Sequence, residues 1–192
     1  MSRIIGLVIL ITSVGIAPAL LADDSAAAAA ALGAESTAYC VSTVNKDRPT
    51  PTAVIVAKVN EACALLAKEG PAAFPKFNGK GSPFIYEGTY VVVDTLNEGE
   101  VLVHALQPGM VGKKLMGLKD VKGKRFFAIM SDLAKEKGEG LVEYYWPKPG
   151  TEEVVRKISF VKKCTMANGV EVAVVSGLFS FNEADVAKLE LH

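Results

Sequence analysis

The first third of the chain has apolar residues spaced as on one face of a helix. In segment 23–46, which starts Ala-rich, the stripe consists of Leu32, Ser36, Tyr39, Cys40 and Val44. A second stripe, in segment 53–69, consists of Ile55, Val59, Ala62, Cys63 and Leu66. Pro49 and Pro51 separate the two stripes, and a proline disfavours the helical conformation in the residue before it. The pattern therefore predicts two helices.

From residue 84 onward, the pattern changes to short runs rich in β-branched and aromatic residues. Such runs, separated by Gly, Pro and Asn-Gly turn signals, predict strands. The expected strands are 84–95, 101–106, 141–146, 154–162 and 170–181. A Gly-punctuated crossover at 108–122 and a helix at about 124–137 separate the second strand from the third. We therefore expect an α+β fold, in which N-terminal helices pack on a five-stranded antiparallel sheet and the helical crossover covers one face.

The predicted hairpin 140–160 contains the residue that fits its surroundings least. Lys157 is a cation inside an otherwise apolar strand, and it lies close in sequence to Tyr144 and Trp146. A carboxylate buried without partners is costly, whereas charge-assisted hydrogen bonds favour it. The hairpin therefore indicates a site for a small organic anion. Alternatively, Lys157 extends along the strand edge or pairs with one of the two glutamates that precede the strand.

Residues on other predicted strands complete this candidate site. Tyr90, Tyr144 and Trp146 would wall a cleft between the sheet and the crossover, where a small ligand would lie. His104 would donate a hydrogen bond to the ligand carboxylate. A purely structural alternative is open for each residue, with His104 as a core histidine and Trp146 as a plug of the hairpin. Their joint occurrence with Lys157 on three strands favours the ligand site.

The N-terminal segment 1–22 has the features of a secretory signal peptide. A basic residue lies near its start, residues 4–16 are apolar apart from Gly, Ser and Thr, and residues 17–22 are mostly small. Cleavage is expected after Ala22, which gives a periplasmic or secreted protein without an attached kinase or chemotaxis module. The alternative is an uncleaved membrane anchor, because the uncharged segment 4–22 approaches the roughly 20 residues that span a bilayer.

Charge and motif content narrow the function further. The chain has 21 basic and 21 acidic residues, a balance that argues against a dedicated nucleic-acid surface. The sequence has two histidines, His104 and His192, and lacks the Ser–His–Asp, HExxH and phosphate-loop signatures, which leaves little for general base catalysis. We therefore expect a binding protein without enzymatic activity, metal or cofactor. An enzyme that uses Cys164 as its nucleophile is the last-ranked alternative.

The three cysteines predict a disulfide in an oxidising compartment. Cys40 and Cys63 lie on the apolar faces of the two predicted helices, almost symmetrically about the proline break. In a helical hairpin they would come opposite each other, which predicts a Cys40–Cys63 bond and leaves Cys164 unpaired at the end of a strand. Two buried thiols, or a pairing with Cys164, are the alternatives.

Several short motifs occur in an order that resembles the single Cache domains. The motifs are PF…TYV…D in segment 84–95, VLVHA, QPGMVGK, LKDVKGKRF, GEG-x-V-x-Y-x-WPKPG, KISFV and SGLF. Single Cache domains are extracytoplasmic ligand-sensing modules with a PAS-like antiparallel sheet. The resemblance implies a long N-terminal helix on that sheet and a pocket for a small ligand, in many members a short-chain carboxylate. It also matches His104, Tyr144, Trp146 and Lys157 to the family's site positions.

The chain departs from the family pattern at four positions. Leu106 stands near the place of a proline, Leu141 at the place of a tryptophan, and Phe160 and Phe179 at places where tyrosine is common. Phe160, on the second strand of the hairpin, is still assigned to the ligand site with the five residues above. Because the two phenylalanines lack a hydroxyl, the resemblance implies an altered or lost specificity.

The pattern and the resemblance together give a domain division and a function. We expect a signal peptide at 1–22, an Ala-rich helical segment at 23–52, a single Cache domain at 53–181 and a tail at 182–192. The expected function is sensory binding of a short-chain carboxylate, with a membrane receptor or sensor kinase as the partner. The alternative is a partner-binding or structural module with a degenerate pocket.

Overall fold

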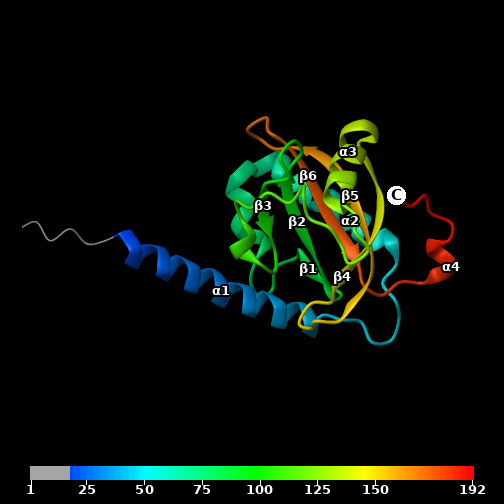
Figure 1. Cartoon of the computed structure of the whole chain (residues 1–192), viewed down its shortest axis with the longest axis horizontal. Coiled ribbons are helices and arrows are strands. Elements are labelled where there is room, and N and C mark those ends of the chain that lie inside the picture. The colour runs from blue at the N-terminus through cyan, green and yellow to red at the C-terminus, as the bar shows by residue number, and fades with distance from the viewer. Residues whose placement is uncertain (1–17) are drawn as a thin grey trace, which may run out of the picture.

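A computed structural model describes residues 18–192, and Figure 1 shows their arrangement. The helices are α1 (Pro18–Ser42), α2 (Thr52–Glu69), α3 (Phe126–Lys137) and α4 (Glu183–Val186), with 3-10 helices η1 (Gly70–Phe77) and η2 (Pro108–Met110). The strands are β1 (Ile85–Tyr86), β2 (Thr89–Thr95), β3 (Val101–His104), β4 (Glu139–Pro147), β5 (Val154–Thr165) and β6 (Glu171–Leu178). Residues 1–17 of the predicted signal peptide lie outside the described residues, so its cleavage stays a prediction.

The strands form one antiparallel sheet in the order β1-β2-β6-β5-β4, and β3 pairs with β2. The predicted fold class is confirmed, but the sheet has six strands because the predicted strand 84–95 is split. A two-residue turn divides it, in which Glu87 and Gly88 both have positive φ, 43° and 73°. Positive φ at both central residues is typical of the tight turn that joins antiparallel strands.

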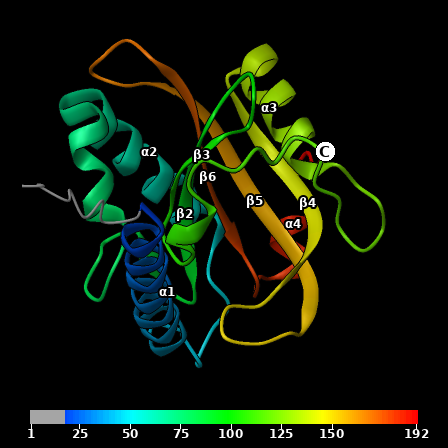
Figure 2. The same cartoon turned by 60° about the vertical axis from the view of Figure 1, so that its left-hand side comes forward.

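The two faces of the sheet are covered by different helices, as Figure 2 shows with α2 and α3 on opposite sides of the strands. Side chains alternate along β2, so Val91 and Val93 point to the α2 face while Tyr90 and Val92 point to the α3 face. The C-terminal half of α1 packs beside β1 and η2 and adds Cys40 to the core of the α3 face. The sheet therefore separates two buried clusters.

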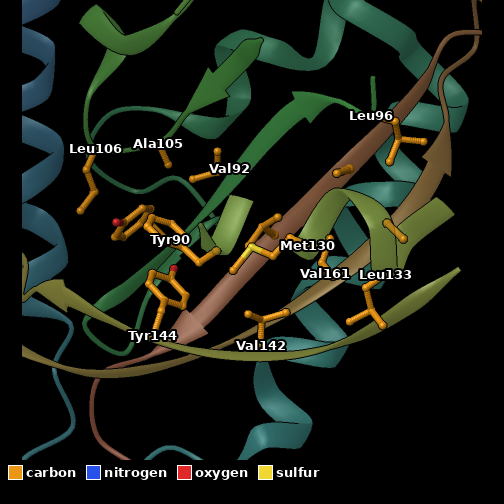
Figure 3. Packing of buried hydrophobic residues seen from close by; sticks show 14 of the residues in the cluster. Tyr90, Val92, Leu96, Ala105, Leu106, Met130, Leu133, Val142, Tyr144 and Val161 are labelled. Carbon is orange, nitrogen blue, oxygen red and sulfur yellow. The ribbon is translucent and has the colours of Figure 1, made fainter. Parts of the chain in front are cut away.

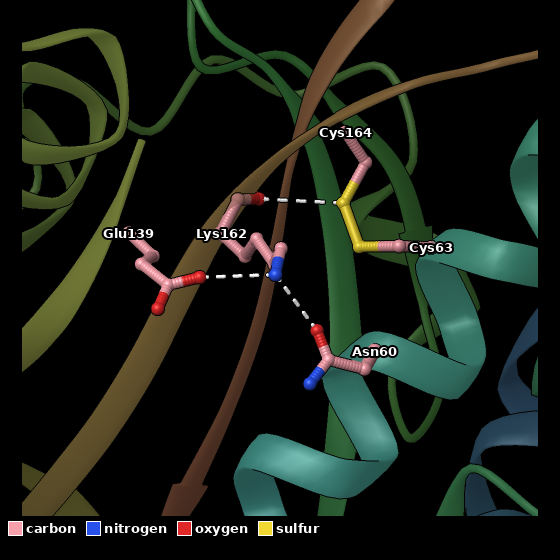
Figure 4. The surroundings of a disulfide bond; sticks show 5 residues. All are labelled: Asn60, Cys63, Glu139, Lys162 and Cys164. Atoms are coloured by element: carbon pink, nitrogen blue, oxygen red, sulfur yellow. Dashed lines mark hydrogen bonds and ion pairs between the residues drawn. A yellow bond between two sulfur atoms is a disulfide. The ribbon is translucent and has the colours of Figure 1, made fainter. Parts of the chain in front are cut away.

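The disulfide joins Cys63 on α2 to Cys164 on β5, with a Cα–Cα distance of 5.6 Å (Figure 4). The predicted Cys40–Cys63 bond is wrong, because α1 and α2 do not form a helical hairpin. Cys63 and Cys164 both lie at the core of the α2 face, whereas Cys40 is a free, buried thiol in the core of the α3 face. The sheet therefore keeps Cys40 apart from the other two cysteines.

Polar contacts accompany the disulfide along the seam between α2 and β5. Lys162 Nζ donates to Asn60 Oδ1 at 2.9 Å and pairs with Glu139 of β4 at 3.0 Å (Figure 4). The loop after β5 also reaches this helix, since Ala167 N donates to Leu66 O at 3.0 Å. These contacts fix the α2 face of the sheet at the end where β5 terminates.

Candidate ligand-binding site

Lys157 lies buried in the first half of β5, on the α3 face of the sheet. It is directly opposite Tyr144 in the β4–β5 pairing, and only 4% of its surface is exposed. Gly177 of β6 leaves room for β5, because a Cβ at that position would clash with Ser159 Oγ and come within 2.8 Å of Lys157 Cε and 2.9 Å of Ile158 O. A glycine is therefore required where the lysine crosses the neighbouring strand.

Three aromatic rings surround the Lys157 amine. Its Nζ lies 4.4 Å from the ring centroid of Phe179, 4.5 Å from that of Tyr90 and 5.8 Å from that of Tyr144. Nζ also donates a hydrogen bond to Tyr90 Oη at 3.4 Å. Ring faces attract cations, so these three rings stabilise the charged amine. They do not supply the negative charge that a counter-ion would provide.

No carboxylate of the described residues forms an ion pair with Lys157. The nearby Glu153, an alternative partner from the sequence, pairs with Lys148 at 3.1 Å instead. Burial lowers the pKa of Lys157 to about 7. A buried amine without a counter-ion is unfavourable, and the arrival of an anion would favour its charged form.

His104 at the end of β3 is held in one tautomer by the chain that follows it. Its Nδ1 accepts hydrogen bonds from Leu106 N at 3.3 Å and Gln107 N at 3.0 Å, so the proton of the neutral ring is on Nε2. Burial, and then the nearby charge of Lys157, lower the pKa of His104 to about 3. No residue in the described part of the chain accepts from Nε2. His104 therefore offers an N–H donor.

The walls of the site come from β4 and α3. Tyr144 stacks on Phe126 with ring centroids 4.0 Å apart, and Trp146 meets Phe126 edge-on at 5.3 Å. Tyr144 Oη is hydrogen-bonded to Ser159 Oγ at 3.0 Å. Figure 3 shows Tyr90 and Tyr144 close together at one end of the apolar cluster. These rings keep water away from the Lys157 amine and strengthen its electrostatic interactions.

A cavity of about 30 Å³ lies between these side chains, with room for a water molecule or two. Its lining includes Tyr90, His104, Tyr144, Trp146 and Lys157, five of the six residues that the sequence assigns to the site. The rest of the lining comes mainly from the crossover and α3, and includes Gln107, Met110, Leu115, Leu118, Phe126, Phe127 and Met130. The sequence analysis did not single out these crossover and α3 residues as part of the site.

Phe160 does not belong to this site. It lies in the core of the α2 face, with Ile55 and Leu66. Residues an odd number of positions apart point to opposite faces of a strand, and Phe160 is three positions from Lys157. The structure therefore does not bring Phe160 to the cavity at Lys157, and this alternation was visible in the sequence. Ser159, two positions from Lys157, is the hairpin residue on the correct face.

The crossover is fastened to β4 by a buried carboxylate. Asp120 Oδ1 accepts from Lys122 N and Lys124 N, each at 2.9 Å, and its Oδ2 accepts from Tyr145 N at 3.0 Å. Asn78 Nδ2 holds the start of the crossover by donating to His104 O at 2.9 Å. The segment over the cavity is thus anchored at both ends.

A second buried titratable residue lies on the same face of the sheet. Asp94 of β2 is 2% exposed, and its Oδ1 has no hydrogen-bond partner. Burial raises the pKa of Asp94 to about 8, so the carboxyl is largely protonated at neutral pH.

Among residues 24–192, no group of three or more His, Cys, Asp or Glu side chains could hold a metal ion.

The fold thus combines an antiparallel sheet with a cavity beneath its crossover, and the lining of that cavity includes hydrogen-bond donors. The family model of the single Cache domain 2 matches residues 74–183, more than half of the chain. The chain belongs to this family of extracytoplasmic ligand-sensing domains. The recognition from the sequence motifs is thus confirmed.

The relatives are chemoreceptors or their sensor domains. The methyl-accepting chemotaxis protein McpP of Pseudomonas putida is 33% identical over 63 residues, which are 33% of this chain and 12% of that receptor. A crystal structure of a methyl-accepting chemotaxis protein from Vibrio parahaemolyticus is 20% identical, with a TM-score of 0.51, and covers 66% of this chain and 84% of its own. A periplasmic sensor domain of a chemotaxis protein is 27% identical, with a TM-score of 0.49, over 83% and 97% of the two chains.

The segment matched to McpP is thus a small part of that receptor. The Vibrio structure supports the fold alone. None of the helices within residues 18–192 is long and apolar enough to cross a membrane.

Proposed function

We propose that this protein is a periplasmic or secreted sensor that binds a small monocarboxylate and presents it to a membrane receptor or sensor kinase. The predicted signal peptide supports this location. The Cys63–Cys164 disulfide supports it as well, because disulfides persist in oxidising compartments outside the cytosol. Membership of a sensor-domain family supports the sensory role.

The observation that carries the proposal is the buried Lys157 without a counter-ion. Around the cavity, Lys157 Nζ, His104 Nε2–H and Tyr90 Oη are all able to donate hydrogen bonds. No carboxylate lines this cavity, so nothing in its lining would repel an anion. A ligand carboxylate would accept from these donors, and its apolar end would lie against the aromatic walls.

The ligand must enlarge the cavity in order to bind. A cavity of about 30 Å³ is smaller than a carboxylate with even a short carbon chain. The described conformation is therefore the closed form, and the free energy of opening reduces the apparent affinity. This cost favours the smallest members of the ligand class.

The test is thermal unfolding of the protein with short-chain carboxylates, and with amines and amino acids as controls. A ligand present at 100 times its Kd stabilises the folded state by about 2.7 kcal/mol, which shifts the Tm by several degrees. We expect a shift with carboxylates only, and none in the Lys157→Met variant. Lys163→Met is the matched control, because Lys163 lies on the same strand but is only half-buried and is paired with Glu171 at 3.2 Å.

The second candidate is a partner-binding module whose pocket no longer binds a ligand. The small size of the cavity and the phenylalanine at position 179, where the family commonly has tyrosine, favour it. A flat response to the whole panel, in protein shown to be free of carried-over ligand, would support this candidate and contradict the sensor.

A further inference from the structure

A second cavity, of about 320 Å³, lies next to the ligand site. It is formed where the end of α1, the β1–β2 turn and the β4–β5 turn meet the segment that follows β6. Its apolar lining consists of Val41, Val44, Pro149, Leu178 and Phe179. A volume of this size is typical of small-molecule sites, whereas the cavity at Lys157 is about tenfold smaller.

One aromatic ring lines the second cavity and also contacts residues that line the first. Phe179 lines the second cavity, and the same ring lies 4.4 Å from Lys157 Nζ. Its centroid is also 6.4 Å from that of Tyr90, which lines the first cavity. Phe179 is only partly buried, since it follows the end of β6 rather than lying inside the sheet. A rotation of this ring would join the cavities.

The charged groups of the second cavity already have partners. Glu87 accepts a hydrogen bond from Thr50 Oγ1 at 2.8 Å and pairs with Arg48 at 3.8 Å. Lys148 pairs with Glu153 at 3.1 Å. The apolar side chains therefore determine what can bind next to Phe179. They favour an apolar group of a ligand over a second charged group.

We infer that Phe179 sets the chain length of the ligand and that the second cavity is the subsite for its hydrocarbon chain. The inference rests on the proposed function, in which the carboxylate binds at Lys157. The ligand enters from the second cavity as the ring of Phe179 swings aside. A short monocarboxylate then lets the ring return to its place over Lys157, whereas a longer chain keeps it displaced. The native protein therefore selects short chains.

The test is a calorimetric titration of straight-chain monocarboxylates from acetate to octanoate against the full-length protein and its Phe179→Ala variant. Each methylene that enters an apolar cavity should improve affinity about fourfold. We expect this gain with the longer acids in Phe179→Ala, while the affinity of the native protein stops rising after the shortest acids. Phe181→Ala is the matched control, because Phe181 packs over Arg156 at 5.2 Å and lines neither cavity.

Two further variants keep the test decisive if Phe179→Ala does not fold. Phe179→Leu should show the same change of chain-length preference to a smaller extent. Adding Val44→Trp to either variant should remove the gain for long chains, because Val44 lines the second cavity away from Lys157. A gain that survives this substitution would overturn the assignment of the subsite.

The failure of the inference differs from the failure of the proposed function. If the native protein binds acetate in a manner that requires Lys157, but both Phe179 variants keep its chain-length profile, Phe179 has no role in selection and the inference is overturned. If no carboxylate binds in a Lys157-dependent manner, the proposed function fails first and the inference fails with it.

Discussion

The two faces of the sheet bury similar amounts of apolar side chain but differ in what lies among those side chains. The α2 face has a core in which Phe77 stacks on Phe84 at 4.2 Å, and the Cys63–Cys164 disulfide ties helix to strand. The α3 face has Lys157, His104 and Asp94 buried in or beside its core. Buried polar groups without partners destabilise a fold.

Under the proposed function, this difference assigns stability mainly to the α2 face and ligand binding to the α3 face. The α2 face can be optimised for packing because it has no ligand to admit. The α3 face keeps a lysine that lacks a counter-ion, a histidine with a free donor and a closed cavity. Unpaired groups of this kind are typical of functional sites, where the ligand supplies the missing partner. Substitutions on the two faces should therefore have opposite effects.

The largest expected effect is the loss of the disulfide. Replacing Cys63 and Cys164 by alanine opens a loop closed over a sequence separation of 101 residues, which should destabilise the protein by about 4 kcal/mol. Denaturant unfolding measures this loss. Ligand binding should survive in the folded variant, since the disulfide lies on the other face. Cys40→Ala, which removes a free thiol, serves as the control, and an equal loss in that variant would refute the role of the bond.

The second effect is a gain in stability from Lys157→Met. Removing a buried, unpaired cation should stabilise the protein by about 2 kcal/mol at pH 7, while carboxylate binding is lost. The pKa of Lys157 is lowered from 10.5 to about 7, so the unfolded state binds the extra proton between these values. The stability of the native protein therefore rises with pH in this window, and the advantage of the variant shrinks.

Chemical denaturation at pH 7 and pH 10 tests this prediction, with Lys163→Met as the control, since Lys163 is half-buried and paired with Glu171. The control should stay within about 0.5 kcal/mol of the native protein. A Lys157→Met variant that is less stable than the native protein at pH 7 would show that the lysine stabilises the fold.

The third effect is a pH dependence that Asp94 gives to the same face. Its pKa is raised from 3.8 to about 8, so the folded state keeps a proton that the unfolded state has released between these values. Its contribution to stability is present at low pH and is lost as pH rises through this window. Asp94→Asn lacks this loss, so its advantage over the native protein should grow by about 2 kcal/mol from pH 5 to pH 7.

The comparison of the native protein with Asp94→Asn separates the contribution of Asp94 from those of the other titrating groups. His104, whose pKa is lowered to about 3, changes stability with the opposite sign at acidic pH, but it does so equally in both proteins. Equilibrium unfolding at several pH values gives the difference directly. A constant difference between pH 5 and pH 7 would contradict the buried, protonated carboxyl.

The smallest effect distinguishes two tyrosines of the site. Tyr90 Oη accepts from Lys157 Nζ and is able to donate to a ligand, so Tyr90→Phe should weaken carboxylate binding about fivefold. Tyr144 Oη is already bonded to Ser159, so Tyr144→Phe should change the affinity by less than about twofold. Calorimetry on both variants tests this order, and the reverse order would place the ligand nearer to β4.

Much of the fold follows from local pattern. The apolar stripe of segment 53–69 and the hairpin 140–160 gave correct elements because their periods are long and their turn signals are strong. The turn at Glu87-Gly88 was missed, since a glutamate with positive φ is uncommon and the strand reads as continuous. Local pattern thus predicts elements well and unusual backbone poorly.

The long-range placement was harder to predict. Five site residues come together because each lies on the inward side of its strand, but the sequence did not indicate which helix covers which face. The disulfide depends on that choice, so a plausible helical hairpin led to the wrong pair. The role of Gly177 was also hidden, because the need for a glycine arises from Lys157, Ile158 and Ser159 on a neighbouring strand.

The most direct test of the account is the uptake of protons when a carboxylate binds. If Lys157 is the counter-ion of the ligand, binding at pH 8 must charge an amine whose pKa is about 7 in the free protein. Calorimetry in two buffers of different ionisation enthalpy should then report an uptake of about one proton in the native protein, and the same uptake in the control variant Lys163→Met. Binding without proton uptake at pH 8 would contradict Lys157 as the carboxylate anchor.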